Sequence, residues 1–186
     1  MRPQKVSDTD LFLGLTTVLK TKGYDGASLN DLADATGLKK ASLYHRFPGG
    51  KKEITQMVLN QVEAWLKDNI LRVLTNRDEK PMNRLSTALN NFQVLYEDGK
   101  AVCILRALSI GNGLDLFGAE LRNAMEIWID GFVQLGLDLG MTKEEAGEKA
   151  TNVLISIQGS LVVANNLGTP EIFNKTLSDI SAMYKK

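Results

Sequence analysis

A basic stretch between a glycine and a proline holds the side chains with the most evident chemistry. Lysine pairs with phosphates or guanine edges, hydroxyls bond phosphate oxygens, and imidazole can donate to either group. A small side chain can also approach a thymine methyl group. This mixture suits contact with DNA. The candidates are Lys39, Lys40, Ala41, Ser42, Tyr44 and His45, between Gly37 and Pro48.

The sequence has few residues that could support catalysis or metal binding. The chain has one Cys and one His, which excludes an intramolecular disulfide and any multi-cysteine metal site. The single His45 lies in the basic stretch, and no acid–base pair stands out. We therefore expect no catalytic residue, no metal and no cofactor, and we expect that the protein is not an enzyme.

Length and composition set the class of protein. The chain has 186 residues, of which 44% are hydrophobic and 24% charged. That is enough for one domain, or for a small domain joined to a larger one, and too apolar for a disordered chain. We find no run of about 18 apolar residues that would span a membrane and no signal peptide. We expect a cytoplasmic protein without membrane contact.

Charge is unevenly distributed along the chain. Overall, 22 Lys and Arg balance 22 Asp and Glu, but residues 1–54 hold nine basic against six acidic side chains. The first 54 residues therefore carry +3 and the other 132 carry −3. A basic segment on an otherwise acidic chain indicates a nucleic-acid surface, although a random fluctuation of charge would look the same.

The elements that must position these side chains are helices. Apolar residues recur with a period of 3.6, and alternation of period two is absent, so we predict an all-α fold. Glycine, proline and capping residues divide the chain into about nine helices. The expected segments are 7–23, 28–37, 39–46, 51–75, 81–96, 102–110, 115–139, 143–166 and 170–185.

The second and third segments have the spacing of a helix-turn-helix. A helix of about nine residues, capped by Ser28, meets a turn containing Gly37, and a helix of about seven residues follows. Their apolar residues can pack against the first helix, which leaves the basic stretch exposed. The N-terminus at Ser28 can also present N–H groups to a phosphate. A generic three-helix unit with a solvated lysine pair fits the spacing equally well.

Residues 9–54 resemble the DNA-binding domain of the TetR family of bacterial transcriptional regulators. The resemblance rests on G-L-K-K-A-S-L-Y-H-R-F, residues 37–47, followed by P-G-G-K-K-E-I, residues 48–54. It implies that Ser28, Tyr44 and Lys51 contact the DNA backbone, and that Lys39, Lys40, Ala41, Ser42 and His45 meet the major groove. The doubled glycine, Gly49-Gly50, is one residue longer than the commonest spacing and is similar to the branch of lincomycin-resistance regulators.

The same resemblance implies how the whole chain is organised. Residues 1–50 would form the DNA-binding domain and residues 51–186 an effector-binding and dimerisation domain. The protein would be a homodimeric repressor of a palindromic operator, paired through helices near 143–166 and 170–185. The run V-L-I-S-I-Q-G-S-L-V-V-A supports burial on two sides of the helix 143–166, although an interior helix of a monomer would show the same pattern.

The effector is expected to be small and apolar or aromatic. Bulky side chains of the longer helices could line its cavity, and a few polar ones could orient it. The bulky candidates are Trp65, Phe92, Tyr96, Phe117, Met125, Trp128 and Phe132, and the polar ones are Ser109, Gln134 and Gln158.

The single cysteine offers a second mode of regulation. Cys103 opens a short helix and lies near Lys100 and Arg106, which would favour its reactive thiolate. A regulator that senses oxidants or electrophiles through Cys103 is therefore an alternative, and an inert packed thiol is another. A helical enzyme or lipophile carrier with a basic surface is the remaining alternative.

Overall fold

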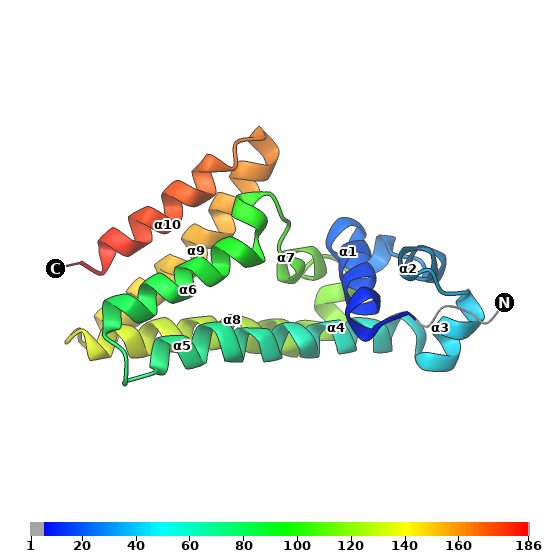
Figure 1. Cartoon of the computed structure of the whole chain (residues 1–186), viewed down its shortest axis with the longest axis horizontal. Helices are drawn as coiled ribbons and strands as arrows, with labels where there is room; N and C mark the ends of the chain where they lie inside the picture. Colours follow the sequence, from blue (N-terminus) through cyan, green and yellow to red (C-terminus); the bar gives the residue numbers. More distant parts are fainter. Residues whose placement is uncertain (1–5, 186) are drawn as a thin grey trace. The chain divides into compact units, whose positions relative to one another are not determined.

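The computed structural model describes residues 6–185, and within this range the chain forms helices and turns but no strand (Figure 1). The all-α prediction is confirmed, and within residues 6–185 so is the number of helices, nine, if α4, η1 and α5 count as one and the short 3-10 helix η2 is left out. The segments are α1 (Asp8–Gly26), α2 (Leu29–Thr36), α3 (Lys40–Arg46), α4 (Gly50–Leu66), η1 (Lys67–Leu71), α5 (Arg72–Thr75), α6 (Pro81–Leu95), η2 (Glu97–Gly99), α7 (Ile104–Leu108), α8 (Asn112–Asp138), α9 (Lys143–Leu167) and α10 (Glu171–Met183).

The chain packs into two compact units. The first unit comprises Met1–Val62 with Ile104–Leu121, and the second comprises Glu63–Cys103 with Arg122–Lys186. These packing units differ from the expected functional division between residues 50 and 51, because α7 and the start of α8 join the first unit. The division into functional domains itself stays a prediction. None of the helices within residues 6–185 is long and apolar enough to cross a bilayer.

In the first unit, α1 supplies the surface on which the short helices pack. Ser7 caps α1 by accepting from the Asp10 N–H, and Leu15 and Leu19 are fully buried. A Cβ at Gly14 would lie 2.5 Å from the carbonyl oxygen of Ala35, so only glycine lets α1 and α2 approach so closely. Gly23 interrupts α1 as expected, with φ of 64°, but one further turn continues to Gly26.

Local signals in the sequence set the helix-turn-helix boundaries. A capping box begins α2, in which the Ser28 hydroxyl accepts from the Asp31 N–H and the Asp31 carboxylate accepts from the Ser28 N–H. Gly37 ends α2 in the left-handed conformation, with φ of 66°. Of the residues of α3, only Leu43 is buried. As expected, apolar residues of the helix-turn-helix are buried, namely Leu32, Ala33, Leu43 and Phe47, whereas Leu29 and Leu38 are only half-buried.

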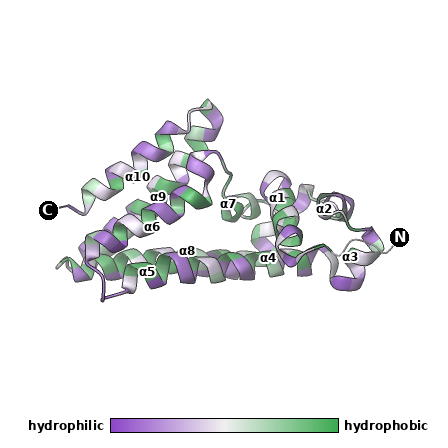
Figure 2. Cartoon of the chain, in the orientation of Figure 1, coloured by the Kyte–Doolittle hydropathy of each residue, from purple (hydrophilic) through white to green (hydrophobic). Residues whose placement is uncertain are grey.

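The second unit is built from longer helices with apolar cores, and green, hydrophobic residues recur along α6, α8 and α9 in Figure 2. Thr142 caps α9 through a capping box with Glu145, and Gly168 ends it in the left-handed conformation. The last helix, α10, packs against α9 and also contacts α6. The helix entering this unit contains one π-helical turn, η1, and the Asn91 side chain donates to the Asn69 carbonyl within that turn at 2.8 Å.

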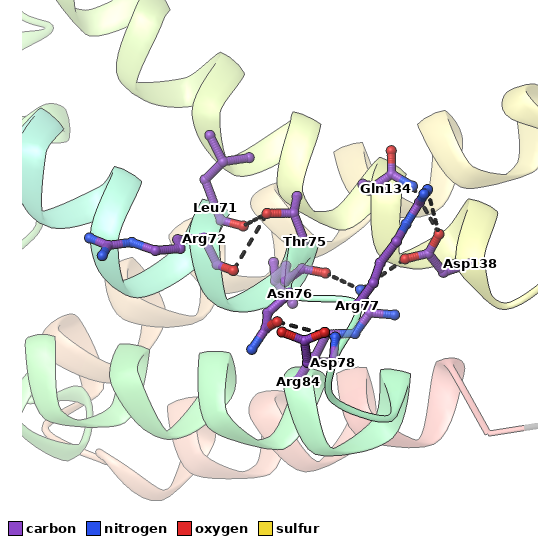
Figure 3. A network of polar contacts seen from close by, with 10 residues as sticks. Leu71, Arg72, Thr75, Asn76, Arg77, Asp78, Arg84, Gln134 and Asp138 are labelled. Carbon is purple, nitrogen blue, oxygen red and sulfur yellow. Dashed lines mark hydrogen bonds and ion pairs between the residues drawn. The ribbon is translucent and has the colours of Figure 1, made fainter.

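A buried ion pair fixes α6 against α8 within the second unit (Figure 3). Arg84 is only 3% exposed, and its Nη1 donates to the Leu74 carbonyl at 2.7 Å and to Asp138 Oδ2 at 2.8 Å. Asp138 also accepts from Gln134 and from Arg77. Burial opposes ionisation of Asp138, but these donors and the two arginine charges outweigh it and lower its pKa.

We expect Asp138→Asn to destabilise the protein by about 3 kcal/mol, because it leaves the buried Arg84 charge without its partner. Arg77→Ala is the control, since Arg77 is 74% exposed and its ion pair should contribute less than about 1 kcal/mol. Denaturant unfolding at one protein concentration measures both. Equal losses for the two variants would contradict a special role for the buried pair.

The difference in the free energy of unfolding between wild type and Asp138→Asn should depend on pH. Because folding lowers the pKa of Asp138, its stabilising effect is present above its unfolded-state pKa and is lost as the pH falls through the folded-state pKa. The stability difference between wild type and Asp138→Asn should therefore be full at neutral pH and shrink in acid.

Candidate functional site

The side chains of the basic stretch lie on the outer surface of α3 and do not bond to other residues of the protein. Within residues 6–185, the side chains of Lys39, Lys40, Ser42 and His45 are exposed and form no hydrogen bond or ion pair. Tyr44 is 44% exposed, and Ala41 is exposed beside it. Six of the eight predicted DNA contacts therefore form one free surface on a short helix.

Two other cations of the first unit, Arg46 and Lys22, pair with acidic side chains. Arg46, in the last turn of α3, pairs with Asp8 at the start of α1. Lys22 pairs with Asp31, and the hydrogen bond from Lys22, with those from Ser28, holds the pKa of Asp31 well below its usual range. These pairs fasten α3 and α2 to α1 and leave Lys39 and Lys40 as the free charges of the α3 surface.

The other two predicted contacts occupy helix N-termini. Ser28 is exposed, but its hydroxyl is engaged in the capping box, where it also donates to Asp31 at 2.7 Å. Lys51 lies in the first turn of α4 and is half-buried. Its Nζ donates to the Tyr24 carbonyl at 2.7 Å. An ammonium has three donors, so two remain for a phosphate.

Four of the predicted effector residues, all aromatic, lie together in the core of the second unit, and a fifth, Gln158, lies close to one of them, Tyr96. The Phe92 ring lies 4.3 Å from that of Trp128 and 6.4 Å from that of Phe132, and Tyr96 stacks on Phe92 at 6.5 Å. The Tyr96 hydroxyl donates to Cys103 Sγ at 3.4 Å. Together they form an aromatic cluster, defined as Phe92, Tyr96, Trp128 and Phe132.

Polar groups in this region are short of partners. Burial, and then Cys103, raises the pKa of Tyr96, and Gln158 opposes the rise. Among the described residues, Trp128 Nε1 is buried and has no hydrogen-bond partner. Buried donors are normally satisfied, so the Trp128 N–H is an unsatisfied donor within the aromatic cluster.

The remaining predicted effector residues lie elsewhere. Phe117 belongs to the first unit, where its ring packs edge-on to Tyr24 at 5.3 Å. Trp65 and Met125 are half-buried, and Trp65 forms no ring contact among the described residues. Ser109 is exposed and bonds the Arg106 carbonyl. Gln134 is engaged by Asp138.

Sequence reasoning missed the Arg84–Asp138 pair and the partners of Lys51. Arg84 had a recognisable signal, since residues 84, 88 and 92 share one face of α6 and all three are buried. A charge in an apolar stripe requires a partner. The Lys51 contacts left no such signal, because Tyr24 is 27 positions away in the sequence.

The chain is similar in sequence to known transcriptional regulators. The family model described as "Bacterial regulatory proteins, tetR family" matches residues 16–56, which include α2, α3 and the start of α4. The HTH-type transcriptional regulator LmrA of Bacillus subtilis (strain 168) is 33% identical over 153 residues, covering 80% of this chain and 81% of LmrA. The negative transcriptional regulator IcaR of the biofilm operon icaADBC, from Staphylococcus aureus (strain Newman), is 33% identical over 81 residues, covering 44% of this chain and 39% of IcaR.

The fold has a solved counterpart over its whole length. A TetR transcriptional regulator from Legionella pneumophila superposes with a TM-score of 0.82 and covers 100% of both chains at 16% identity. The resemblance first suggested by residues 37–54 is thus confirmed over most of the sequence. The chain belongs to the TetR family of bacterial transcriptional regulators and is a DNA-binding regulator of the repressor type.

Proposed function

We propose that this protein is a homodimeric repressor that a small apolar or aromatic effector releases from a palindromic operator. The observation that carries the proposal is the free surface of α3, on which Lys39, Lys40, Ser42 and His45 are exposed without internal partners. Such a surface suits the major groove, where these side chains reach base edges and phosphates. A repressor with this role acts in the cytoplasm, where bacterial operators lie.

The dimer would form through the outer face of α9. Ile155 is 61% exposed and Val163 is 44% exposed, and both share one face with Gly159, since they are four residues apart. A Cβ at Gly159 would meet no atom within 4 Å. An apolar stripe with a glycine at its centre lets a second helix approach closely, and α10 beside it would complete a four-helix interface.

The effector would bind at the aromatic cluster. The unpartnered N–H group of Trp128 would donate to an acceptor atom of the effector, and the rings would contact its apolar body. Because Phe92 and Trp128 lie only 4.3 Å apart, an effector that enters between them must separate the rings. That rearrangement would favour a dimer whose recognition helices no longer match the operator spacing.

Operator binding tests the proposal directly. We expect the protein to shift DNA from upstream of its own gene, and Lys39→Ala and Lys40→Ala each to weaken binding and reduce the salt slope by about one unit for every lost phosphate contact. A lysine that reads a base should also relax sequence preference. Lys143→Ala, in the first turn of α9, is the control. Unchanged binding by both α3 variants at matched salt would contradict a role for α3.

The oligomeric state is tested separately. We expect Ile155→Glu to produce monomers and abolish operator binding, because it buries a charge in the proposed interface and because reading a palindrome requires two recognition helices. Val94→Glu is the matched control, since Val94 is 78% exposed on α6. Sedimentation and mobility-shift assays measure both properties. A dimeric Ile155→Glu variant would place the interface elsewhere.

The cysteine alternative makes a distinct prediction. Cys103 is only 3% exposed and accepts a hydrogen bond from Tyr96, which fits a packed thiol better than a sensor. We expect Cys103→Ser to keep operator affinity, and we expect peroxide or an alkylating agent to affect wild type and variant alike. Release of wild type alone at low oxidant dose would establish Cys103 as the sensor.

A further inference from the structure

Three helix ends meet in the first unit, and Lys51 is one of the residues that join them. The last turn of α1 provides Tyr24 and Asp25, the first turn of α4 provides Lys51, and α8 begins at Asn112. We call these four residues the helix-end junction. None of its hydrogen bonds was predictable from local sequence patterns.

Tyr24 fixes the position of the Lys51 ammonium. Besides the hydrogen bond to the Tyr24 carbonyl, Lys51 Nζ lies 4.3 Å from the centroid of the Tyr24 ring. A cation over an aromatic face is attracted by the ring. The Tyr24 ring itself packs edge-on against Phe117, which is fully buried. Any displacement of the last turn of α1 would therefore move Lys51.

Asp25 ties that last turn to the start of α8. Its Oδ2 accepts from the Asn112 backbone N–H at 3.0 Å and its Oδ1 from Asn112 Nδ2 at 2.9 Å. A carboxylate at a helix N-terminus satisfies a free N–H group and complements the helix dipole. The Asn112 side chain, its backbone N–H and the Lys51 charge lower the pKa of Asp25, so the carboxylate stays ionised.

Two glycines next to the helix-end junction have neighbouring atoms too close to leave room for a side chain. Gly111 has φ of 60°, and a Cβ there would overlap the Asp25 carboxylate. Gly23 has φ of 64°, and its Cβ would lie 3.0 Å from the Ala107 carbonyl oxygen. Gly111 therefore lets the turn between α7 and α8, and Gly23 lets α7 itself, lie against the end of α1 at a separation that a side chain would prevent.

We propose that Asp25 and Asn112 are positioning residues that hold Lys51 where it can bind an operator phosphate. The inference rests on the proposed function, because it assumes that Lys51 contacts DNA. The segment Ile104–Leu121 continues directly into the second unit at both of its ends. A shift of the turn that precedes α8 would break the Asp25–Asn112 hydrogen bonds and withdraw Lys51 from the phosphate.

A double-mutant cycle tests this coupling in the full-length protein. Operator dissociation constants are measured over a range of salt for wild type, Asp25→Ala, Lys51→Ala and the double variant. We expect Lys51→Ala and Asp25→Ala each to weaken binding roughly 3- to 10-fold and to flatten the salt slope by about one unit. In the Lys51→Ala background, Asp25→Ala should have no further effect.

Matched variants separate positioning from charge and from folding. Asp34→Ala removes an exposed acid of α2 and reports the general effect of one lost negative charge. Asn112→Ala removes only the side-chain donor to Asp25 and should give part of the Asp25→Ala effect, so the cycle can also be run with this milder change. Circular dichroism and thermal unfolding verify that each variant is folded.

The outcomes distinguish the inference from the proposed function. Wild-type protein that binds no operator would remove the proposed function itself. Operator binding by wild type with additive effects of Asp25→Ala and Lys51→Ala would overturn the inference alone. An unchanged salt slope in Lys51→Ala would also overturn it, because Lys51 would then touch no phosphate.

Discussion

A helix of seven residues cannot hold its shape in water alone, because the first turn costs more order than its few hydrogen bonds return. The recognition helix α3 is such a helix, and Leu43 is its only buried residue. Its structure therefore depends on how tightly α1 and α2 hold it. Gly14 permits the close approach of α1 and α2, and the Arg46–Asp8 pair ties α3 to α1.

This dependence explains how the charges of the first unit are used. Acids neutralise Arg46 and Lys22 where those cations fasten one helix to another, and Tyr24 holds Lys51. On the outer face of α3, Lys39 and Lys40 form no ion pair with any residue that the structure describes. Although the net charge of the chain is zero, its cations therefore have two roles. Some join helices to one another, and others face the solvent.

The sequence by itself determined the helices and most of their boundaries, although α1 continues past Gly23 to Gly26 and α8 begins at Asn112, three residues before its predicted start. Caps, glycines and apolar periodicity are local signals, and they set the ends of α2 and α9 at Ser28, Gly37, Thr142 and Gly168. The exposed basic stretch also followed from local pattern, because a short helix with one apolar residue has few side chains to bury. The family was recognisable from residues 37–54 for the same reason, since the motif lies within one contiguous segment.

Only the tertiary structure decided which distant groups meet. Phe117 and Trp128 both have aromatic side chains in α8, yet Phe117 packs against Tyr24 while Trp128 joins the aromatic cluster of the second unit. Lys51 and Arg84 are basic residues in helices, but one is held by a carbonyl and a ring and the other is buried beside Asp138. Periodicity reports which face of a helix is buried, whereas the partner depends on how helices far apart in sequence cross, and no local pattern encodes that crossing.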